Sequence, residues 1–96
     1  METTRQLIEQ LRQHQFHIST AESCTGGMIA SMLVGVSGAS EVFEEGYVTY
    51  SNEVKIKNLG VSAETIRKYT VVSGPVAEEM AKGAADRSGA ALALST

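Results

Sequence analysis

Ser23 and Lys55 are the residues of this sequence whose types and spacing best fit nucleophilic catalysis. Ser23 lies in Ala21-Glu22-Ser23-Cys24-Thr25-Gly26-Gly27, where a β-branched run ends and a helical pattern begins. A junction of this kind presents unpaired backbone N–H groups and the positive end of a helix dipole. A hydroxyl nucleophile or an anionic ligand would suit that place. The alternative is a tight turn in which Thr25 only caps the helix.

Lys55 belongs to a second polar cluster, which also contains Tyr50, Ser51 and Asn52. Asn52 to Lys55 spans about one helical turn, so the Lys55 side chain can point back over the strand end toward Ser23. A lysine held among apolar groups beside a helix N-terminus loses part of its preference for charge, and its neutral amine can accept the serine proton. The alternative is an ordinary exposed lysine.

Neighbouring groups would complete this chemistry. Tyr50 could shuttle the proton or hydrogen-bond the leaving group, while backbone N–H groups of residues 23–27 would stabilise the developing oxyanion. Cys24 is the rival nucleophile. Because no histidine stands near it in the sequence, we interpret Cys24 as a small packing residue.

The elements that must position these residues alternate between helix and strand. Apolar periodicity predicts strands over residues 16–21, 47–50 and 90–95, and helices over residues 3–15, 28–34, 52–58, 63–69 and 75–88. The run 90–95 is unbroken and apolar, which is typical of a strand buried on both faces of a parallel sheet. The alternation predicts an α/β fold, a three-layer α/β/α sandwich with a mostly parallel sheet. Ligands in such sheets bind beyond the carboxyl ends of the strands, where Ser23, Ser51 and Thr96 follow.

Capping residues set the expected helix ends. Asn52 is predicted to cap the helix that runs to Asn58, and Ser62 the helix that follows it. Pro75 suits a first helical turn, and Gly89 should end the last helix.

Composition narrows the class of protein. Ninety-six residues predict one domain with a small core. A net charge of −3, with acids and bases mixed along the chain, argues against a nucleic-acid partner. Apolar runs are too short for a membrane span, and the first residues lack a signal-peptide core, so we expect no membrane partner and a cytoplasmic location. One cysteine, Cys24, and two histidines, His14 and His17, predict neither an internal disulfide nor a metal site.

The same motifs resemble a known family. They look like the C-terminal domain of the competence/damage-inducible protein CinA, also known as the nicotinamide-nucleotide amidase PncC. The resemblance runs from about residue 5 to residue 96, and the segments that carry it are residues 21–27, Gly46-Tyr47-Val48-Thr49-Tyr50-Ser51-Asn52-x-x-Lys55, Leu59-Gly60-Val61, Val72-Ser73 and Met80-Ala81-x-Gly83-Ala84.

The resemblance implies a function. It implies hydrolysis of the amide of nicotinamide mononucleotide to nicotinic acid mononucleotide and ammonia, without metal or cofactor. By motif position, Ser23, Lys55 and Tyr50 would be catalytic. The expected substrate-binding residues are Thr25, Gly26, Gly27, Ser51 and Asn52. The competing hypothesis is a non-catalytic module that binds a nucleotide or a partner in competence or DNA-damage responses.

Departures from the family pattern lie in loops and at the C-terminus. Thr70-Val71 stands where the family has Gly-Ala, and Ser37 where a proline is common. Family domains continue beyond the third strand with a further loop, two strands and a helix. We therefore expect an incomplete domain whose third strand is exposed at an edge, with little hydrolysis by the chain alone. We also expect association, either into a homo-oligomer or with a separate segment that supplies the rest of the domain.

Overall fold

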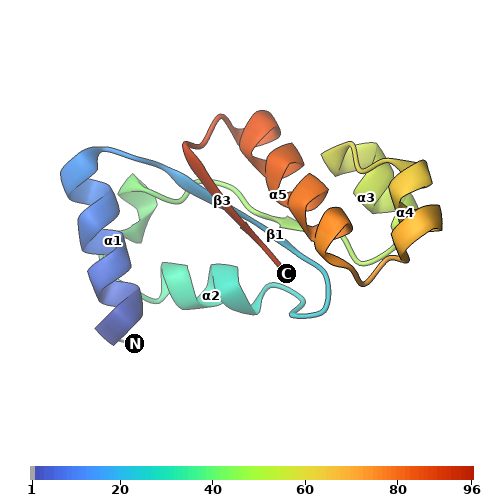
Figure 1. Cartoon of the computed structure of the whole chain (residues 1–96). Coiled ribbons are helices and arrows are strands. Elements are labelled where there is room, and N and C mark those ends of the chain that lie inside the picture. The colour runs from blue at the N-terminus through green and yellow to red at the C-terminus, as the bar shows by residue number, and fades with distance from the viewer. Residues whose placement is uncertain (1) are drawn as a thin grey trace.

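Helices alternate with three short strands along the chain, as the sequence pattern predicts (Figure 1). The computed structural model describes residues 2–96. Its elements, in chain order, are α1 (Glu2–His14), β1 (Ile18–Glu22), α2 (Met28–Val34), the 3₁₀ helix η1 (Ala39–Glu41), β2 (Tyr47–Val48), α3 (Asn52–Leu59), α4 (Ala63–Tyr69), α5 (Gly74–Ser88) and β3 (Leu92–Ser95).

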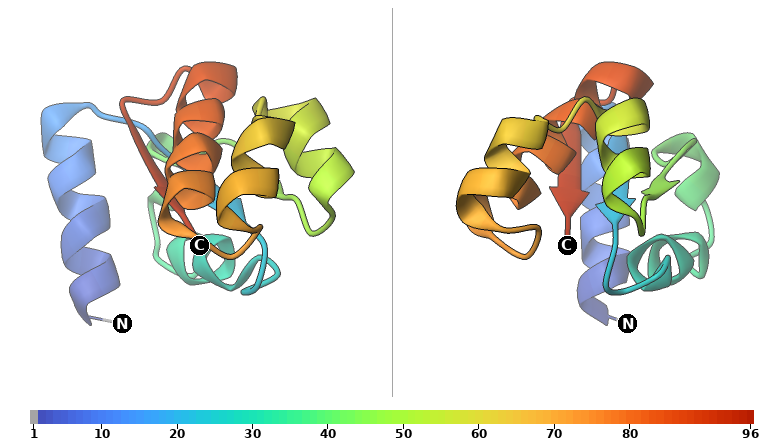
Figure 2. Two further views of the ribbon diagram at one scale, coloured as in Figure 1. Left: turned by 45° about the vertical axis from the view of Figure 1, so that its right-hand side comes forward. Right: turned by 90° about the vertical axis from the view of Figure 1, so that its right-hand side faces the viewer.

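The strands form one parallel sheet in the order β2-β1-β3. Ala21 of β1 pairs with Tyr47 on one side and with Ser95 on the other. Helix α5 packs on β1 and β3, and α2 lies across the opposite face of the sheet (Figures 1 and 2). The predicted α/β architecture with a parallel sheet is therefore confirmed.

Two apolar clusters hold the layers together. Residues of α1, β1, α2 and the η1 region form the first: Ile8, Leu11, Ile18, Leu33, Ala39 and Val42. Residues around α5 form the second: Ala21, Leu59, Val61, Val76, Met80 and Ala84. Central strand β1 is buried at each of its five positions, because a layer of helices covers each of its faces.

Serine caps begin three of the helices. The Ser51 hydroxyl accepts the Val54 N–H at 3.2 Å, and Ser62 and Ser73 accept bonds in the same way at the starts of α4 and α5. The predicted Asn52 cap is thus wrong by one residue, since Asn52 is the first residue of α3. The Ser62 cap, the Pro75 first turn and the Gly89 stop are confirmed.

All three strand predictions need correction. The second strand, β2, is only Tyr47–Val48 and so ends two residues before the predicted end at Tyr50. The first strand begins at Ile18 rather than Phe16, because the Phe16 N–H donates to the Leu11 carbonyl at 3.0 Å and so still belongs to the end of α1. Strand β3 is not buried on both faces: Leu92 and Leu94 are 45% and 46% exposed. Among residues 2–96, β3 pairs only with β1, so it lies at the edge of the sheet.

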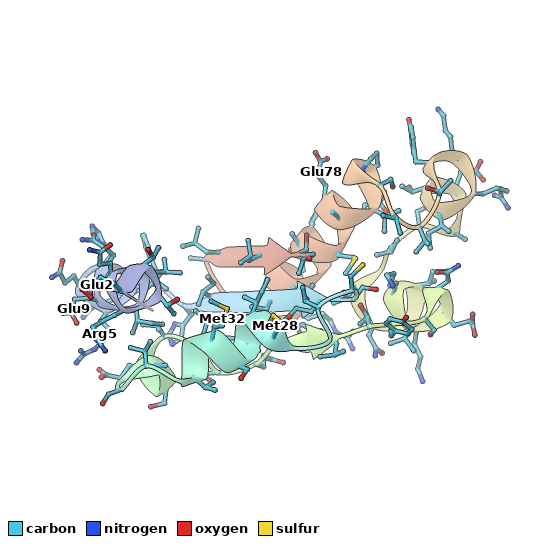
Figure 3. The ribbon with its side chains drawn as sticks, turned by 90° about the horizontal axis from the view of Figure 1, so that it is seen from below. Glu2, Arg5, Glu9, Met28, Met32 and Glu78 are labelled. Atoms are coloured by element: carbon cyan, nitrogen blue, oxygen red, sulfur yellow. The ribbon has the colours of Figure 1, made fainter. Side chains whose placement is uncertain are left out.

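Helix α2 leaves apolar side chains exposed on the flank nearer β3. Met28 and Met32, one helical turn apart, lie together there, whereas Glu2, Arg5, Glu9 and Glu78 lie at the periphery (Figure 3). Met28 is 62% exposed and Met32 42%. No helix among residues 2–96 is both long enough and apolar enough to cross a membrane.

Candidate active site

The turn after β1 holds Ser23 at the carboxyl edge of the sheet. The Ser23 N–H donates to the Thr96 carbonyl at 2.9 Å, and the Ser23 carbonyl accepts the Gly26 N–H at 3.2 Å. Gly26 and Gly27 have φ angles of 63° and 107°, which side chains rarely tolerate. The two glycines therefore let the chain reverse between β1 and α2. Ser23, which directly follows β1, stays bound to Thr96, which directly follows β3.

Lys55 reaches this turn from α3. Its side chain is buried, and its Nζ donates to Ser23 Oγ at 2.9 Å, to the Thr49 carbonyl at 2.7 Å and to the Tyr50 carbonyl at 3.1 Å. Burial lowers the pKa of Lys55 below the ordinary lysine value, and nearby Cys24 opposes that change. The prediction that Lys55 points back toward Ser23 agrees with this geometry, and the exposed-lysine alternative does not.

Glu22 is a functional candidate that sequence reasoning missed. Its carboxylate is completely buried and accepts four hydrogen bonds, from the Thr25 hydroxyl at 2.7 Å and from the N–H groups of Gly27, Ile29 and Ala30 at 3.2, 2.9 and 2.9 Å. Burial by itself raises the pKa of Glu22, but these bonds outweigh it and hold the pKa below its usual value. The available signal was an acid at the end of a strand, six residues before a helix start.

The sequence predicted unpaired N–H groups at this turn that could bind an anionic ligand, but the Glu22 carboxylate already occupies those at the start of α2. The N–H groups at the start of α2 are bound to a side chain of the protein itself. The alternative is wrong as well, because Gly27, not Thr25, precedes the first residue of α2, and the Thr25 hydroxyl donates to Glu22. Within the stretch 23–27, Ser23, Gly26 and Gly27 donate their N–H groups to described residues, while those of Cys24 and Thr25 do not.

A cavity of about 700 Å³ lies beside Ser23 and Lys55. Its polar wall contains Ser23, Cys24, Tyr50, Asn52, Lys55 and Thr96. The opposite wall, formed by the loop before α5 and by α5 itself, is mainly apolar, with Val71, Val72, Ala77 and Met80. Tyr50 is 79% exposed and stands at the open side of the cavity. The space is large enough for a small organic molecule.

The predicted site residues divide into two groups. Ser23, Lys55, Tyr50 and Asn52 line the cavity together. Thr25, Gly26, Gly27 and Ser51 do not line it, and the contacts described above give them structural roles in the turn and in the α3 cap. Their binding of substrate stays a prediction.

The sequence did not predict the apolar wall of the cavity. Val71 and Val72 fall in a short stretch without periodicity, and Ala77 and Met80 look like ordinary core positions of a helix. Only the docking of α5 beside β1 brings these residues opposite Ser23. Among residues 2–96, no three His, Cys, Asp or Glu side chains cluster as ligands for a metal ion.

Comparisons with known proteins agree along the whole chain. A family model described as the CinA C-terminal domain matches residues 1–96. The chain is 51% identical over 89 residues to a CinA-like protein of Kosmotoga olearia and 49% identical over 88 residues to one of Chloroherpeton thalassium. These alignments cover 93% and 92% of this chain, and 22% and 21% of those proteins.

The fold of the chain also matches those of solved structures. A CinA superfamily protein from Escherichia coli superimposes with a TM-score of 0.94 at 38% identity, covering 96% of this chain and 54% of that one. Competence/damage inducible protein CihA from Agrobacterium tumefaciens gives 0.91 at 40% identity, covering 98% and 57%. The chain thus spans about one fifth of the length of the relatives above and somewhat more than half of each solved chain. Sequence and structure together show that this chain belongs to the CinA C-terminal domain family.

Proposed function

We propose that the chain carries the catalytic pair of a nicotinamide-nucleotide amidase, which hydrolyses the carboxamide of nicotinamide mononucleotide to the carboxylate and ammonia. One observation carries the proposal: a buried Lys55 amine, with a pKa lowered by burial, lies 2.9 Å from the hydroxyl of Ser23. This is the arrangement of a serine nucleophile beside an amine base. The family resemblance supplies the substrate.

The first half of the reaction makes an ester. The neutral Lys55 amine removes the Ser23 hydroxyl proton as Oγ attacks the carboxamide carbon. The carbonyl oxygen becomes an oxyanion, for which we assign the Cys24 N–H as donor, because it follows the nucleophile, belongs to a cavity-lining residue and has no other partner among residues 2–96. The C–N bond then breaks, and the Lys55 ammonium gives its proton to the leaving nitrogen, which departs as ammonia.

The second half restores the enzyme. Water attacks the ester carbon, Lys55 accepts a proton from that water, and the C–O bond to Ser23 breaks. The serine oxygen takes the proton back, and the free carboxylic acid ionises in solution. Tyr50, whose side chain lines the same cavity, is placed to hydrogen-bond the leaving nitrogen or the incoming water. The apolar wall of Val72, Ala77 and Met80 suits the flat face of a pyridine ring.

The test is ammonia release from nicotinamide mononucleotide. It should be measured for this chain and for a version extended at its C-terminus to the length of the solved relatives, with the Ser23→Ala variant as the background rate. Hydrolysis that requires Ser23 in either version supports the proposal. Absence of hydrolysis from both versions contradicts it.

A non-catalytic interaction module is the second candidate. The observation in its favour is the apolar surface on the exposed side of the sheet, formed by Leu92 and Leu94 of β3. A binding module needs no reactive serine, so reaction of Ser23 with a fluorophosphonate probe separates the two candidates. Selective labelling of Ser23 favours the amidase.

A further inference from the structure

Glu22 is the buried charged group that the reaction above leaves without a role. Its four hydrogen bonds all come from the turn and helix that follow it, namely from Thr25, Gly27, Ile29 and Ala30. No lysine, arginine or histidine within residues 2–96 forms an ion pair with it. A buried carboxylate without a cationic partner is costly unless hydrogen bonds satisfy both oxygens, as they do here.

These bonds decide the shape of the turn that carries Ser23. Gly27, which precedes α2, has no side chain to cap the helix, so Glu22 provides the acceptors that a capping residue would otherwise supply. One carboxylate oxygen, Oε1, accepts hydrogen bonds from Thr25, Gly27 and Ile29. Residues 23–26 are therefore closed into a loop between Glu22 and its own hydrogen-bond donors.

The backbone of Glu22 fixes the other side of the site. Its carbonyl accepts a hydrogen bond from the Thr49 N–H at 2.9 Å, and the Thr49 carbonyl in turn accepts one from Lys55 Nζ at 2.7 Å. The residue next to Ser23 is thus joined by its side chain to the turn and by its main chain to the segment that holds Lys55. Glu22, the last residue of β1, therefore helps to fix the positions of both Ser23 and Lys55.

We propose that Glu22 is the positioning residue of the site. Its carboxylate holds the turn so that Ser23 Oγ stays within reach of Lys55 and the Cys24 N–H stays open toward the cavity. By occupying the donors at the start of α2, it also prevents that helix end from competing for the substrate carbonyl. This inference rests on the proposed amidase function, because it concerns the same serine and lysine.

Glu79 offers a matched comparison within the chain. Its carboxylate also binds a helix start, accepting the Ser62 N–H at 2.7 Å and the Thr65 hydroxyl at 2.6 Å, and its pKa is lowered by these bonds. Glu79 does not line the cavity. If both residues served stability alone, each substitution would change the free energy of unfolding and leave the reactivity of Ser23 in the folded protein unchanged. A role in positioning makes Glu22, and not Glu79, affect that reactivity.

The experiment compares Glu22→Gln with Glu79→Gln. Two rates are measured: labelling of Ser23 by a fluorophosphonate, in which Oγ bonds to phosphorus and fluoride leaves, and kcat and KM for ammonia release by whichever chain length is active. We expect Glu22→Gln to lower the labelling rate and kcat by about 10²-fold, as for a misplaced reacting group, with KM changed much less. Glu79→Gln should leave both rates near those of the parent.

The Thr25 variants decide the case if Glu22→Gln does not fold. Thr25→Val removes one donor to the carboxylate, and Thr25→Ser keeps it, so the serine variant should label faster than the valine variant. Equal labelling of the parent, Glu22→Gln and Thr25→Val would overturn the inference while the proposed function stands. A parent chain whose Ser23 neither labels nor supports hydrolysis would overturn both together.

Discussion

The Lys55 Nζ lies 2.9 Å from Ser23 Oγ although the two residues are 32 positions apart in the sequence. Strand β1 ends just before Ser23, and helix α3 starts three residues before Lys55. Because β1 and β2 are parallel neighbours, the segments that follow them meet at the same edge of the sheet. The pairing of serine and lysine is therefore a product of the sheet topology.

Replacing the nucleophile should abolish hydrolysis without unfolding the protein. In the active chain length, Ser23→Ala should lower ammonia release by about 10³-fold or more, because no other hydroxyl is hydrogen-bonded to Lys55 among residues 2–96. Steady-state ammonia assays and circular dichroism measure the two effects. Cys24→Ala is the control, and loss of activity in Cys24→Ala with retention in Ser23→Ala would make the cysteine the nucleophile.

Lys55 should make the free energy of unfolding rise with pH in the alkaline range. Its pKa in the folded state is lower than the ordinary 10.5, so between these two values the unfolded chain binds more protons than the folded one. The free energy of unfolding contributed by this site must therefore rise with pH across that window and level off above about 10.5. Urea denaturation at a series of pH values, compared with Lys55→Met, isolates this contribution. Both proteins should carry Cys24→Ser, which removes the neighbouring group that opposes the change at Lys55. A pH-independent difference between them would refute the lowered pKa.

Glu22 should affect the stability of the protein at acidic pH. Its pKa is lowered in the folded state from 4.5, so its contribution to stability is complete above about pH 4.5 and is lost as the pH falls through the lower, folded value. At pH 7 we expect Glu22→Gln to cost about 2–3 kcal/mol, since charge-assisted hydrogen bonds to a buried group are lost. The deficit should shrink in acid. Thermal denaturation of both proteins between pH 7 and pH 3 checks this, and a deficit that stays constant would count against an ionised Glu22.

Gly83 should tolerate no side chain. A Cβ at this position would lie 1.9 Å from the carbonyl oxygen of Leu59, where α5 crosses the end of α3. Because the obstacle is backbone, relief requires the two helices to separate, and we expect Gly83→Ala to destabilise the fold by about 3 kcal/mol. Gly74→Ala is the matched control, since a Cβ there meets open space. Equal urea midpoints for the two variants would show that the helices are not held at this contact.

The exposed edge at β3 predicts self-association. Leu92 and Leu94 are nearly half exposed and belong to β3, whose outer edge has no partner among residues 2–96. Such edges pair with other chains. Sedimentation velocity should show association that increases with concentration. The double variant Leu92→Lys, Leu94→Lys should stay monomeric, while Ile56→Lys, on α3, should behave like the parent. A parent chain that is monomeric at every concentration would refute this expectation.

Local patterns predicted the elements better than they predicted the surroundings of the site. The helix Met28–Val34 was predicted residue for residue, because small and apolar residues follow two glycines, and the Ser62 cap followed from side-chain chemistry alone. The cap of α3 was assigned to Asn52 rather than to Ser51, since both residue types cap helices equally well. The Ser23–Lys55 contact was predictable because it depends only on strand ends and one helical turn.

The features that the sequence did not predict depend on tertiary contacts. The partners of Glu22 depend on how the turn folds back on the strand, and the wall formed by Val72 and Met80 depends on where α5 docks. The apolar composition of Leu92–Ser95 indicated a strand suited to burial, but burial also requires neighbours on both sides, which composition does not reveal. Sequence therefore specified what each residue could do, and packing specified which neighbours it met.

The hydrogen bond between the Ser23 N–H and the Thr96 carbonyl has a practical consequence for handling the protein. Thr96 is part of the cavity wall, so an affinity tag, dye or surface linker fused directly after it would start at the rim of the cavity and compete with small molecules for entry. No residue of α1 lines that cavity. Immobilisation for binding measurements, and any reporter group, should therefore be attached ahead of α1, where the added mass leaves the approach to Ser23 open.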